Sequence, residues 1–406
     1  MKNMVLKNAF YLSGSEFLSK AFFFISLYFM ARAYGPEGIG KYSFAFTYGS
    51  IFMIFANWGL NNLIIRELND IKDRSRYLGN IFSLKLIFGL LFMGTSVLLA
   101  LIILEKDMFI LILFTAAILL TDNLTSIFYS IFRYQENMLP EATIKIFHNI
   151  LIVSLSLYNI LSGNELIYIF ISFFIGKLFA FFVSFLIFSL KSRMFIPELN
   201  KQIIKKILIK GLPFMLISLS GLIIYRVDIL MLKFLKGYEI VGLYEAAYNI
   251  IRNIDSLMLF FSVSFYSRLC KIKDIKKSFV FLKKSFMQYF VFILFFILGI
   301  LLFGNKIILF IYGPDFLISV KILYLISFGA IFLFLNKLNI HFINSINKPW
   351  INVLLILAGA ILNIILNLLL IPSLGWMGAA ISSITSYMLI FGVYVKIIFS
   401  QSYKKS

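Results

Sequence analysis

The sequence has little of what a soluble enzyme needs. Only 14% of its 406 residues are charged, and it contains one cysteine and two histidines, whereas about a quarter of an ordinary soluble domain is charged. The lone Cys270 excludes an intrachain disulfide, and its place in a basic stretch favours a spectator thiol in a reducing compartment. His148 and His341 lie far apart in the chain, without ligand partners at metal-binding spacing, which excludes a structural zinc site.

Motifs for nucleotide binding and covalent catalysis are also absent. The sequence has no GxxxxGK[ST] loop, no GxSxG elbow and no Cys/His pairing. No acidic motif lies in a sizeable outer loop, which argues against a membrane glycosyltransferase or polymerase. The sequence therefore predicts that the protein is not an enzyme, and it offers no catalytic residue, no metal ligand and no bound cofactor.

What the chain has in abundance is apolar residues. Hydrophobic residues make up 61% of the chain, Phe alone supplies 48, and the mean hydropathy is +0.96. A globule of this size would expose too much apolar surface to water, so the composition demands lipid as solvent. A spanning helix needs about 20 apolar residues, and twelve such segments predict an all-α polytopic membrane protein. The expected spans are 9–32, 42–65, 80–103, 108–131, 142–162, 167–189, 208–232, 240–265, 283–303, 317–344, 351–372 and 376–399.

The longest loop between expected spans divides them into two groups of six. We expect an N-terminal lobe at 1–190, a basic cytoplasmic loop at 191–207 and a C-terminal lobe at 208–406. A weak repeat supports this division, because GKYSFAFTY (40–48) and GLYEAAYNI (242–250) are related by an offset of 202 residues. Both halves would begin on the same side of the membrane, so the repeat would be a parallel one.

The excess positive charge orients the expected spans. The formal net charge is +20, which in a soluble protein would suggest nucleic acid. Here most Lys and Arg lie in or near the loops on one side, as in the cytoplasmic loops of membrane proteins. We therefore expect no nucleic acid partner, a multi-pass protein of the cytoplasmic (plasma) membrane, and both termini in the cytoplasm.

Ionisable side chains occur within the expected spans. Each costs about 2.5–3.5 kcal/mol at the centre of a helix by insertion scales, and such residues usually face a bundle interior or a watery cavity. The intramembrane set is too large for a purely lipid-embedded scaffold, so a hydrated cavity is the economical explanation. The set comprises Glu16, Lys20, Lys85, Asp122, Lys177, Arg226, Asp228, Glu245, Arg252, Asp255 and Lys337.

Seven of these residues are the predicted cavity residues. Lys20, Lys177 and Arg252 lie at middle depth and would hold an anionic group, with Arg226 nearer the outer face. Of the deepest carboxylates, Glu16, Asp122 and Asp255, at least one is expected to couple transport to a proton or sodium gradient.

Several alternatives stay open at this point. Glu16 and Lys20 are four residues apart on one helix face, and Arg252 and Asp255 are three apart, so each pair could simply neutralise itself. Lys85 and Lys337 lie nearer the inner face, where their side chains could extend to the headgroups. The asparagines Asn363 and Asn367 would either hold helices together or contact sugars.

Ordered motifs along the chain resemble those of a known family. They are ARAYGPEGIGKYSFAFTYGSIF (31–52), LPFMLISLSGLIIYRVDILMLKFLKGYEIVGLYEAAYNI (212–250), FGNKIILFIYGPDF (303–316) and NIILNLLLIPSLGWMGAAISSITSY (363–387). In this order they resemble polysaccharide (O-antigen) repeat-unit flippases, the Wzx-like branch of the multidrug/oligosaccharidyl-lipid/polysaccharide exporter (MOP) superfamily.

The resemblance implies a specific activity. It implies a flippase that moves a polyprenyl-diphosphate-linked oligosaccharide across the membrane through a V-shaped, MATE-like cavity between two six-helix lobes. It also implies membrane lipid and a glycan polymerase or ligase as partners. The alternative is a cation-coupled exporter of small drugs or metabolites, which should concentrate acidic groups. The intramembrane charges are six basic and five acidic, which does not favour an acidic pocket.

Overall fold

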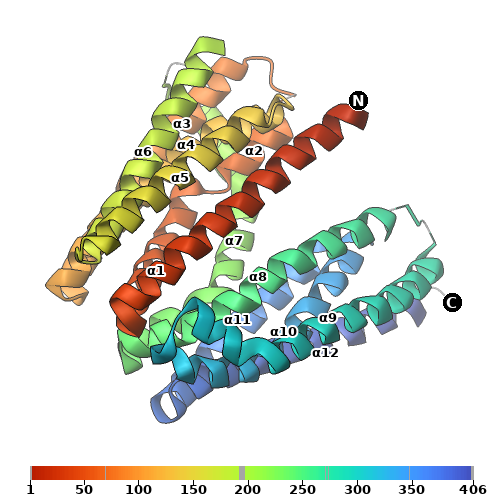
Figure 1. Cartoon of the computed structure of the whole chain (residues 1–406). Coiled ribbons are helices and arrows are strands. Elements are labelled where there is room, and N and C mark those ends of the chain that lie inside the picture. Colours follow the sequence, from red (N-terminus) through yellow and green to blue (C-terminus); the bar gives the residue numbers. More distant parts are fainter. Residues whose placement is uncertain are drawn as a thin grey trace. The chain divides into compact units, whose positions relative to one another are not determined.

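The computed structural model describes residues 2–68, 70–191, 197–269, 271–272, 274–346 and 348–403, and in these ranges the chain is helical without a strand (Figure 1). The expectation for Cys270 lies outside the described residues. The helices are α1 (Lys2–Asn57), α2 (Leu60–Glu67), α3 (Arg74–Ile103), α4 (Lys106–Tyr134), α5 (Leu139–Leu161), α6 (Ile167–Lys191), α7 (Lys201–Lys236), α8 (Tyr238–Leu269), α9 (Ile275–Ile311), α10 (Leu317–Ser345), α11 (Pro349–Leu374) and α12 (Trp376–Tyr403), with a 3₁₀ turn at Pro314–Phe316.

The first two expected spans form the single long element α1, which is broken at Gly35. This residue has φ 60° and ψ −167°, a conformation that only glycine adopts without strain. Pro36 follows, and its fixed φ suits the first position of a helix. The second expected span ends earlier than the sequence suggests, because the chain turns at Trp58 and Gly59 before α2 begins.

Nine of the described helices are long and apolar enough to cross a bilayer. With the two segments of α1 and with α8, they account for the twelve expected spans. Helix α8 falls below this measure of apolarity, and it carries Glu245, Arg252 and Asp255 along its length. The all-α membrane architecture predicted from the sequence is confirmed, and the protein is a multi-pass membrane protein.

The chain divides into two compact units. Unit 1 comprises Met1–Tyr34 and Ala45–Leu219, and unit 2 comprises Gly35–Phe44 and Ser220–Ser406. In unit 1, a core of aliphatic and aromatic side chains joins α2, α3, α4 and α6 to the start of α7. Phe128 on α4 lies at its centre, with the rings of Phe181, Phe185 and Phe188 of α6 around it.

Unit 2 contains a backbone crossing between the second segment of α1 and the start of α8. A Cβ atom on Gly40 would lie 1.8 Å from the carbonyl oxygen of Tyr238, and one on Gly242 would lie 1.8 Å from that of Pro36. Only glycine permits this approach, as at small-residue interfaces between membrane helices. The pairs are reciprocal and share the 202-residue offset of the predicted repeat, so the crossing has local two-fold symmetry.

The segment between the sixth and seventh spans is partly helical. We expected a loop at 191–207, but α7 begins at Lys201 and continues through Pro213 to Lys236. Asn200 precedes the helix, and its side-chain oxygen accepts hydrogen bonds from the backbone N–H groups of Gln202 and Ile203. This N-cap explains why helix formation starts before the apolar stretch does.

Candidate functional site

Two arginines share one carboxylate in unit 2. Arg226 of α7 lies with its Nη1 atom 3.2 Å from Oε1 of Glu245 on α8. Arg252, two turns along α8, donates from Nη2 to the same oxygen and to Oδ1 of Asn249. Glu245 is buried, with 4% of its side chain exposed, whereas Arg226 and Arg252 are 30% and 22% exposed. Two positively charged side chains therefore share one carboxylate, and both are more accessible than that carboxylate.

Hydrogen-bonding capacity remains in this arginine cluster. Oε2 of Glu245 and Nη1 of Arg252 are buried and have no hydrogen-bond partner within the described residues. Guanidinium groups pair with carboxylate and phosphate groups through two parallel hydrogen bonds. The unpartnered Nη1 of Arg252 is therefore a donor suited to an anion, whereas the unpartnered oxygen of Glu245 needs a donor.

The predicted residues of unit 1 are arranged differently, and only Lys177 and Asp122 form a one-to-one ion pair with each other. Nζ of Lys177 lies 2.6 Å from Oδ1 of Asp122, and these side chains are 23% and 42% exposed. Glu16 pairs with Lys145 at 2.5 Å rather than with Lys20, so the i,i+4 pair considered from the sequence is not the arrangement adopted. Lys20 is half-buried and forms no ion pair among the described residues.

The second local pair considered from the sequence is also replaced by a longer-range contact. Asp255 lies 2.9 Å from Nζ of Lys337 on α10, while Arg252 is bound to Glu245. Lys337 thus pairs within the protein, since only 14% of its side chain is exposed. Of the seven predicted residues, Glu16, Lys20, Asp122 and Lys177 belong to unit 1, and Arg226, Arg252 and Asp255 belong to unit 2.

The most enclosed carboxylate in unit 2 is Asp228 on α7, which is 2% exposed. Its Oδ2 accepts hydrogen bonds from the hydroxyl of Tyr244 at 2.8 Å and from that of Ser383 at 2.7 Å. Its Oδ1 accepts one from Nδ2 of Asn367 at 2.8 Å. All three partners are neutral, and they come from α8, α12 and α11. We call this group the Asp228 nest.

Further polar side chains lie next to members of the Asp228 nest. Asn363, one turn before Asn367 on α11, accepts a hydrogen bond from it at 3.0 Å. The hydroxyls of Tyr248 and Tyr387 lie 2.7 Å apart. The asparagines of α11 therefore connect helices within the protein, which is the first of the two roles considered from the sequence.

Sequence reasoning included Asp228 among the intramembrane charges but not among the site residues. Arg226 is two positions away and so lies on another face of α7. The signal that could have found the nest is a carboxylate with no basic residue one turn away on its own helix, combined with hydroxyl and amide groups in other spans.

Lys85 of α3 does not extend to the headgroups, which was one of its two interpretations. Its side chain is fully buried in unit 1.

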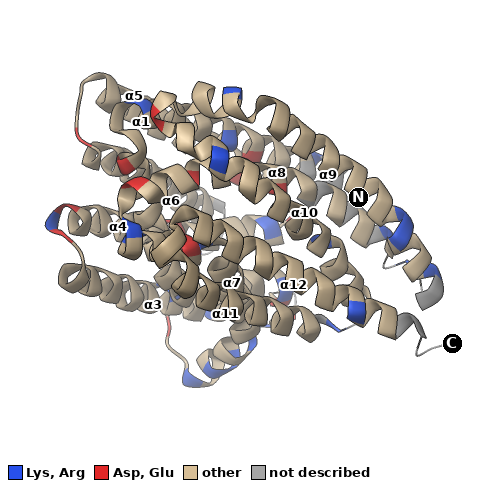
Figure 2. Ribbon diagram, turned by 90° about the horizontal axis from the view of Figure 1, so that it is seen from below, with Lys and Arg blue, Asp and Glu red and all other residues tan. Residues whose placement is uncertain are grey.

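Figure 2 shows that charged residues, blue and red, lie along the helices as well as at their ends. No group of three or more His, Cys, Asp or Glu side chains suited to a metal ion occurs in the described ranges.

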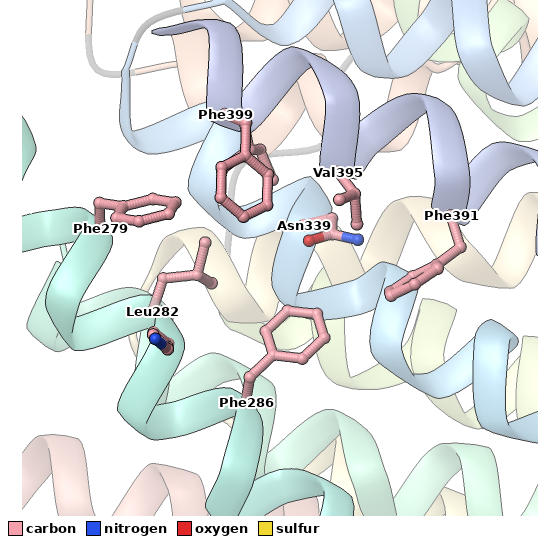
Figure 3. Close-up of a pocket in the computed structure, with 9 residues that line it drawn as sticks. Phe279, Leu282, Phe286, Asn339, Phe391, Val395 and Phe399 are labelled. Atoms are coloured by element: carbon pink, nitrogen blue, oxygen red, sulfur yellow. The ribbon is translucent and has the colours of Figure 1, made fainter. Parts of the chain in front are cut away.

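Unit 2 also contains an apolar pocket of about 370 Å³ between α9, α10 and α12 (Figure 3). Phe279 and Phe286 approach it from α9, and Phe391 and Phe399 from α12. The exposed Lys283 also lines it. The pocket combines an aromatic lining with one cation, a combination that suits an amphipathic anion with an apolar tail.

Comparison with solved structures finds proteins with a similar fold. Its fold is similar to that of a multidrug resistance MATE family transporter of the MOP superfamily in an inward-facing conformation, with TM-score 0.76, 14% identity and 96% of each chain covered. It is also similar to the lipid II flippase MurJ in an inward closed conformation, with TM-score 0.76, 17% identity, and 94% of this chain and 86% of that chain covered. At these identities, the similarity shows the fold.

Sequence comparison gives one short match and one long one. An uncharacterized membrane protein of Methanocaldococcus jannaschii is 35% identical over 89 residues, which are 22% of this chain and 18% of that protein. The model of the polysaccharide biosynthesis protein family matches residues 5–273, about two thirds of the chain. The resemblance noted from the sequence motifs is thus confirmed, and the chain belongs to the polysaccharide biosynthesis protein family.

Proposed function

We propose that this protein is a flippase that moves a polyprenyl-diphosphate-linked oligosaccharide across the cytoplasmic membrane by alternating access. The observation that carries the proposal is the arginine cluster, in which Arg226 and Arg252 share the single carboxylate of Glu245. Membership of a polysaccharide biosynthesis family and the MOP transporter fold support it. In this cluster two guanidinium groups share one carboxylate, and guanidinium groups bind phosphate oxygens through paired hydrogen bonds.

The diphosphate would complete the coordination of the arginines and compete with Glu245 for them. Sugars and phosphates lose several kcal/mol per group when stripped of water in hydrocarbon, so they need a polar path while the isoprenoid tail remains in lipid. In unit 1 we propose that Lys20 and Lys177 also bind anionic groups of the substrate. Lys20 has no ion-pair partner among the described residues, and Lys177 would exchange its partner Asp122 for the substrate.

The apolar pocket of Figure 3 suits the lipid part of such a substrate. Its aromatic lining would contact isoprene units. The remaining partners that we propose are membrane lipid and a glycan polymerase or ligase acting on the exported glycan. We propose no cofactor beyond an ion gradient.

We propose that the gradient acts at the Asp228 nest. A carboxylate held by three neutral donors in a low-dielectric interior is stabilised when a proton or a monovalent cation compensates its charge. Asp122, Asp255 and Glu16, the carboxylates that we expected to couple transport, each have a lysine partner. Asp228 has none within hydrogen-bonding distance among the described residues, so it is the stronger candidate.

Deletion of the gene, followed by complementation with variants, tests the proposal. We expect lipid-linked glycan to accumulate on the cytosolic face of the membrane in the deletion strain, and we expect Arg226→Ala/Arg252→Ala to fail to restore export at normal protein level. An unchanged glycan profile with altered drug sensitivity would favour the exporter of small molecules. A matched control is Lys106→Ala, which removes an exposed basic residue at the start of α4.

Reporter fusions test the proposed orientation. A reporter fused after residue 163 or 373 should lie outside the cell, because we propose that both termini are cytoplasmic. Cytoplasmic signals at both positions would contradict this topology without affecting the substrate assignment.

A further inference from the structure

Lys85 lies within a cage of oxygen atoms in unit 1. Its Nζ atom is 2.6 Å from Oδ1 of Asn61 on α2 and 2.7 Å from Oγ of Ser126 on α4. The backbone oxygen and Oδ1 of Asn123 on α4 are each 3.0 Å away. Lys85 and Asn123 are fully buried. Four oxygens from two helices thus surround one nitrogen carried by a third.

The number and kind of these contacts indicate a site for a positive charge. An ammonium group has three N–H donors and no acceptor, whereas a neutral amine has one donor fewer and a lone pair. All four neighbours present oxygen, and none is a carboxylate. Asp122, the residue before Asn123 on α4, is itself paired with Lys177. The charge of Lys85 is therefore compensated by neutral dipoles, as for a metal cation bound by carbonyl and amide oxygens.

We propose that this oxygen cage is a monovalent-cation site whose occupant is the ammonium group of Lys85 itself. The contact distances match charge-assisted N–H···O hydrogen bonds, so the site has the dimensions of an ammonium ion. Truncation of Lys85 to Ala removes the three outer methylene groups and the ammonium, which together have the size of propylammonium. The truncated protein should therefore bind small alkylammonium ions.

The proposal has a consequence that rests on the function proposed above. A covalently attached cation cannot exchange with the medium, so unit 1 would not respond to an ion gradient at this site. The cation that drives transport would then act at another site, and the Asp228 nest of unit 2, which has no attached cation, is the site that we propose.

The experiment measures thermal unfolding of the purified full-length protein in lipid nanodiscs, with choline chloride as the reference salt. For Lys85→Ala we expect methyl-, ethyl- and propylammonium chloride to raise the melting temperature progressively, by at least about 3 °C for propylammonium. The wild-type protein and Lys85→Gln, whose amide fills the cage, should not respond. Propanol serves as the neutral molecule of the same shape as propylammonium, and tetramethylammonium as a cation that is too large.

Each outcome decides the proposal. An equal gain with propanol and propylammonium in Lys85→Ala would show that the site needs volume rather than charge, and the proposal would be overturned. The proposal would also be overturned if propylammonium has no effect on Lys85→Ala, or if it stabilises the wild-type protein as much as Lys85→Ala. If Lys85→Ala unfolds in choline, recovery of folded protein only when propylammonium is present supports the proposal, and no recovery contradicts it. Because the readout is stability, these results are independent of whether the substrate is a lipid-linked glycan.

Discussion

Each of the two units contains a buried charge that is surrounded by neutral groups, and these two charges, Lys85 and Asp228, have opposite sign. In unit 1 the ammonium of Lys85 is surrounded by oxygen atoms of Asn61, Asn123 and Ser126. In unit 2 the carboxylate of Asp228 is surrounded by donors from Tyr244, Asn367 and Ser383. Neither group has an oppositely charged partner within hydrogen-bonding distance among the described residues.

The difference between these sites shows how neutral groups can hold a charge in a membrane protein. A buried charge is tolerated when dipoles of the correct sign satisfy it. A site built from acceptors suits a cation, and in unit 1 the chain supplies that cation itself. A site built from donors around an anion leaves the carboxylate able to take up a proton or a cation, so we expect unit 2 to be the unit that responds to ions.

The largest expected effect comes from removing the attached cation. Lys85→Met keeps the length and apolar volume of the side chain but leaves four oxygens without their donor. We expect a loss of about 3–5 kcal/mol in the free energy of unfolding, as when one partner of a buried charged interaction is deleted. Denaturant unfolding in detergent measures this loss, and Lys106→Met at an exposed position is the control. If Lys85→Met loses no more unfolding free energy than the control, the oxygen atoms around Lys85 do not stabilise a charge.

The next effect concerns the backbone rather than the charges. Gly242→Ala would place a methyl group 1.8 Å from the carbonyl oxygen of Pro36 in unit 2, whereas Gly211→Ala in unit 1 would place one 2.4 Å from that of Trp58. Overpacking costs about 1–3 kcal/mol of unfolding free energy. We expect the loss for Gly242→Ala to lie at the upper end of this range and to be larger than the loss for Gly211→Ala.

The same unfolding measurement checks the local two-fold symmetry of the crossing. Gly40→Ala should match Gly242→Ala, because the two contacts are reciprocal. The control is Gly221→Ala, since a Cβ there has no neighbour within 4 Å. Unequal effects of the two crossing variants would contradict the symmetry.

A smaller effect, on transport, tests the carboxylate of unit 2. Asp228→Asn preserves the shape of the side chain, and the hydroxyls of Tyr244 and Ser383 can reorient to accept from the new amide. We expect the protein to fold but to lose about tenfold in export, equivalent to 1.4 kcal/mol, because the titratable charge is gone. Glycan export corrected for protein level measures this, and the exposed Asp107→Asn is the control. Normal export that remains sensitive to the ion gradient would exclude Asp228 as the coupling group.

The smallest expected effect distinguishes the shared carboxylate in unit 2 from the simple pair in unit 1. Arg252→Lys retains charge but cannot hold Glu245, Asn249 and a diphosphate together, so we expect about fivefold lower export, or about 1 kcal/mol. Lys177→Arg, which retains a one-to-one pair with Asp122, should change export less. The reverse order would show that the principal contact with the anion lies in unit 1.

The long apolar runs of the chain were sufficient to predict the class of fold. Runs of about 20 apolar residues identify spanning helices without knowledge of tertiary contacts, because lipid requires every backbone group to be satisfied within the helix. The errors lie at element ends, where local capping rather than hydropathy decides, as at Asn200.

The amino-acid sequence alone was enough to identify a helical membrane protein of the polysaccharide biosynthesis protein family and to locate charges within its spans. It was not enough to identify the partners of these charges, which depend on how the helices pack. Spacing along one helix suggested Glu16 with Lys20 and Arg252 with Asp255, yet Glu16 pairs with Lys145 and Asp255 with Lys337. Glu16 and Asp255 pair with lysines of other helices because packing, and not spacing along one helix, brings their side chains together. Residues such as Asp228 and Asn367, 139 positions apart, become neighbours only when those helices pack.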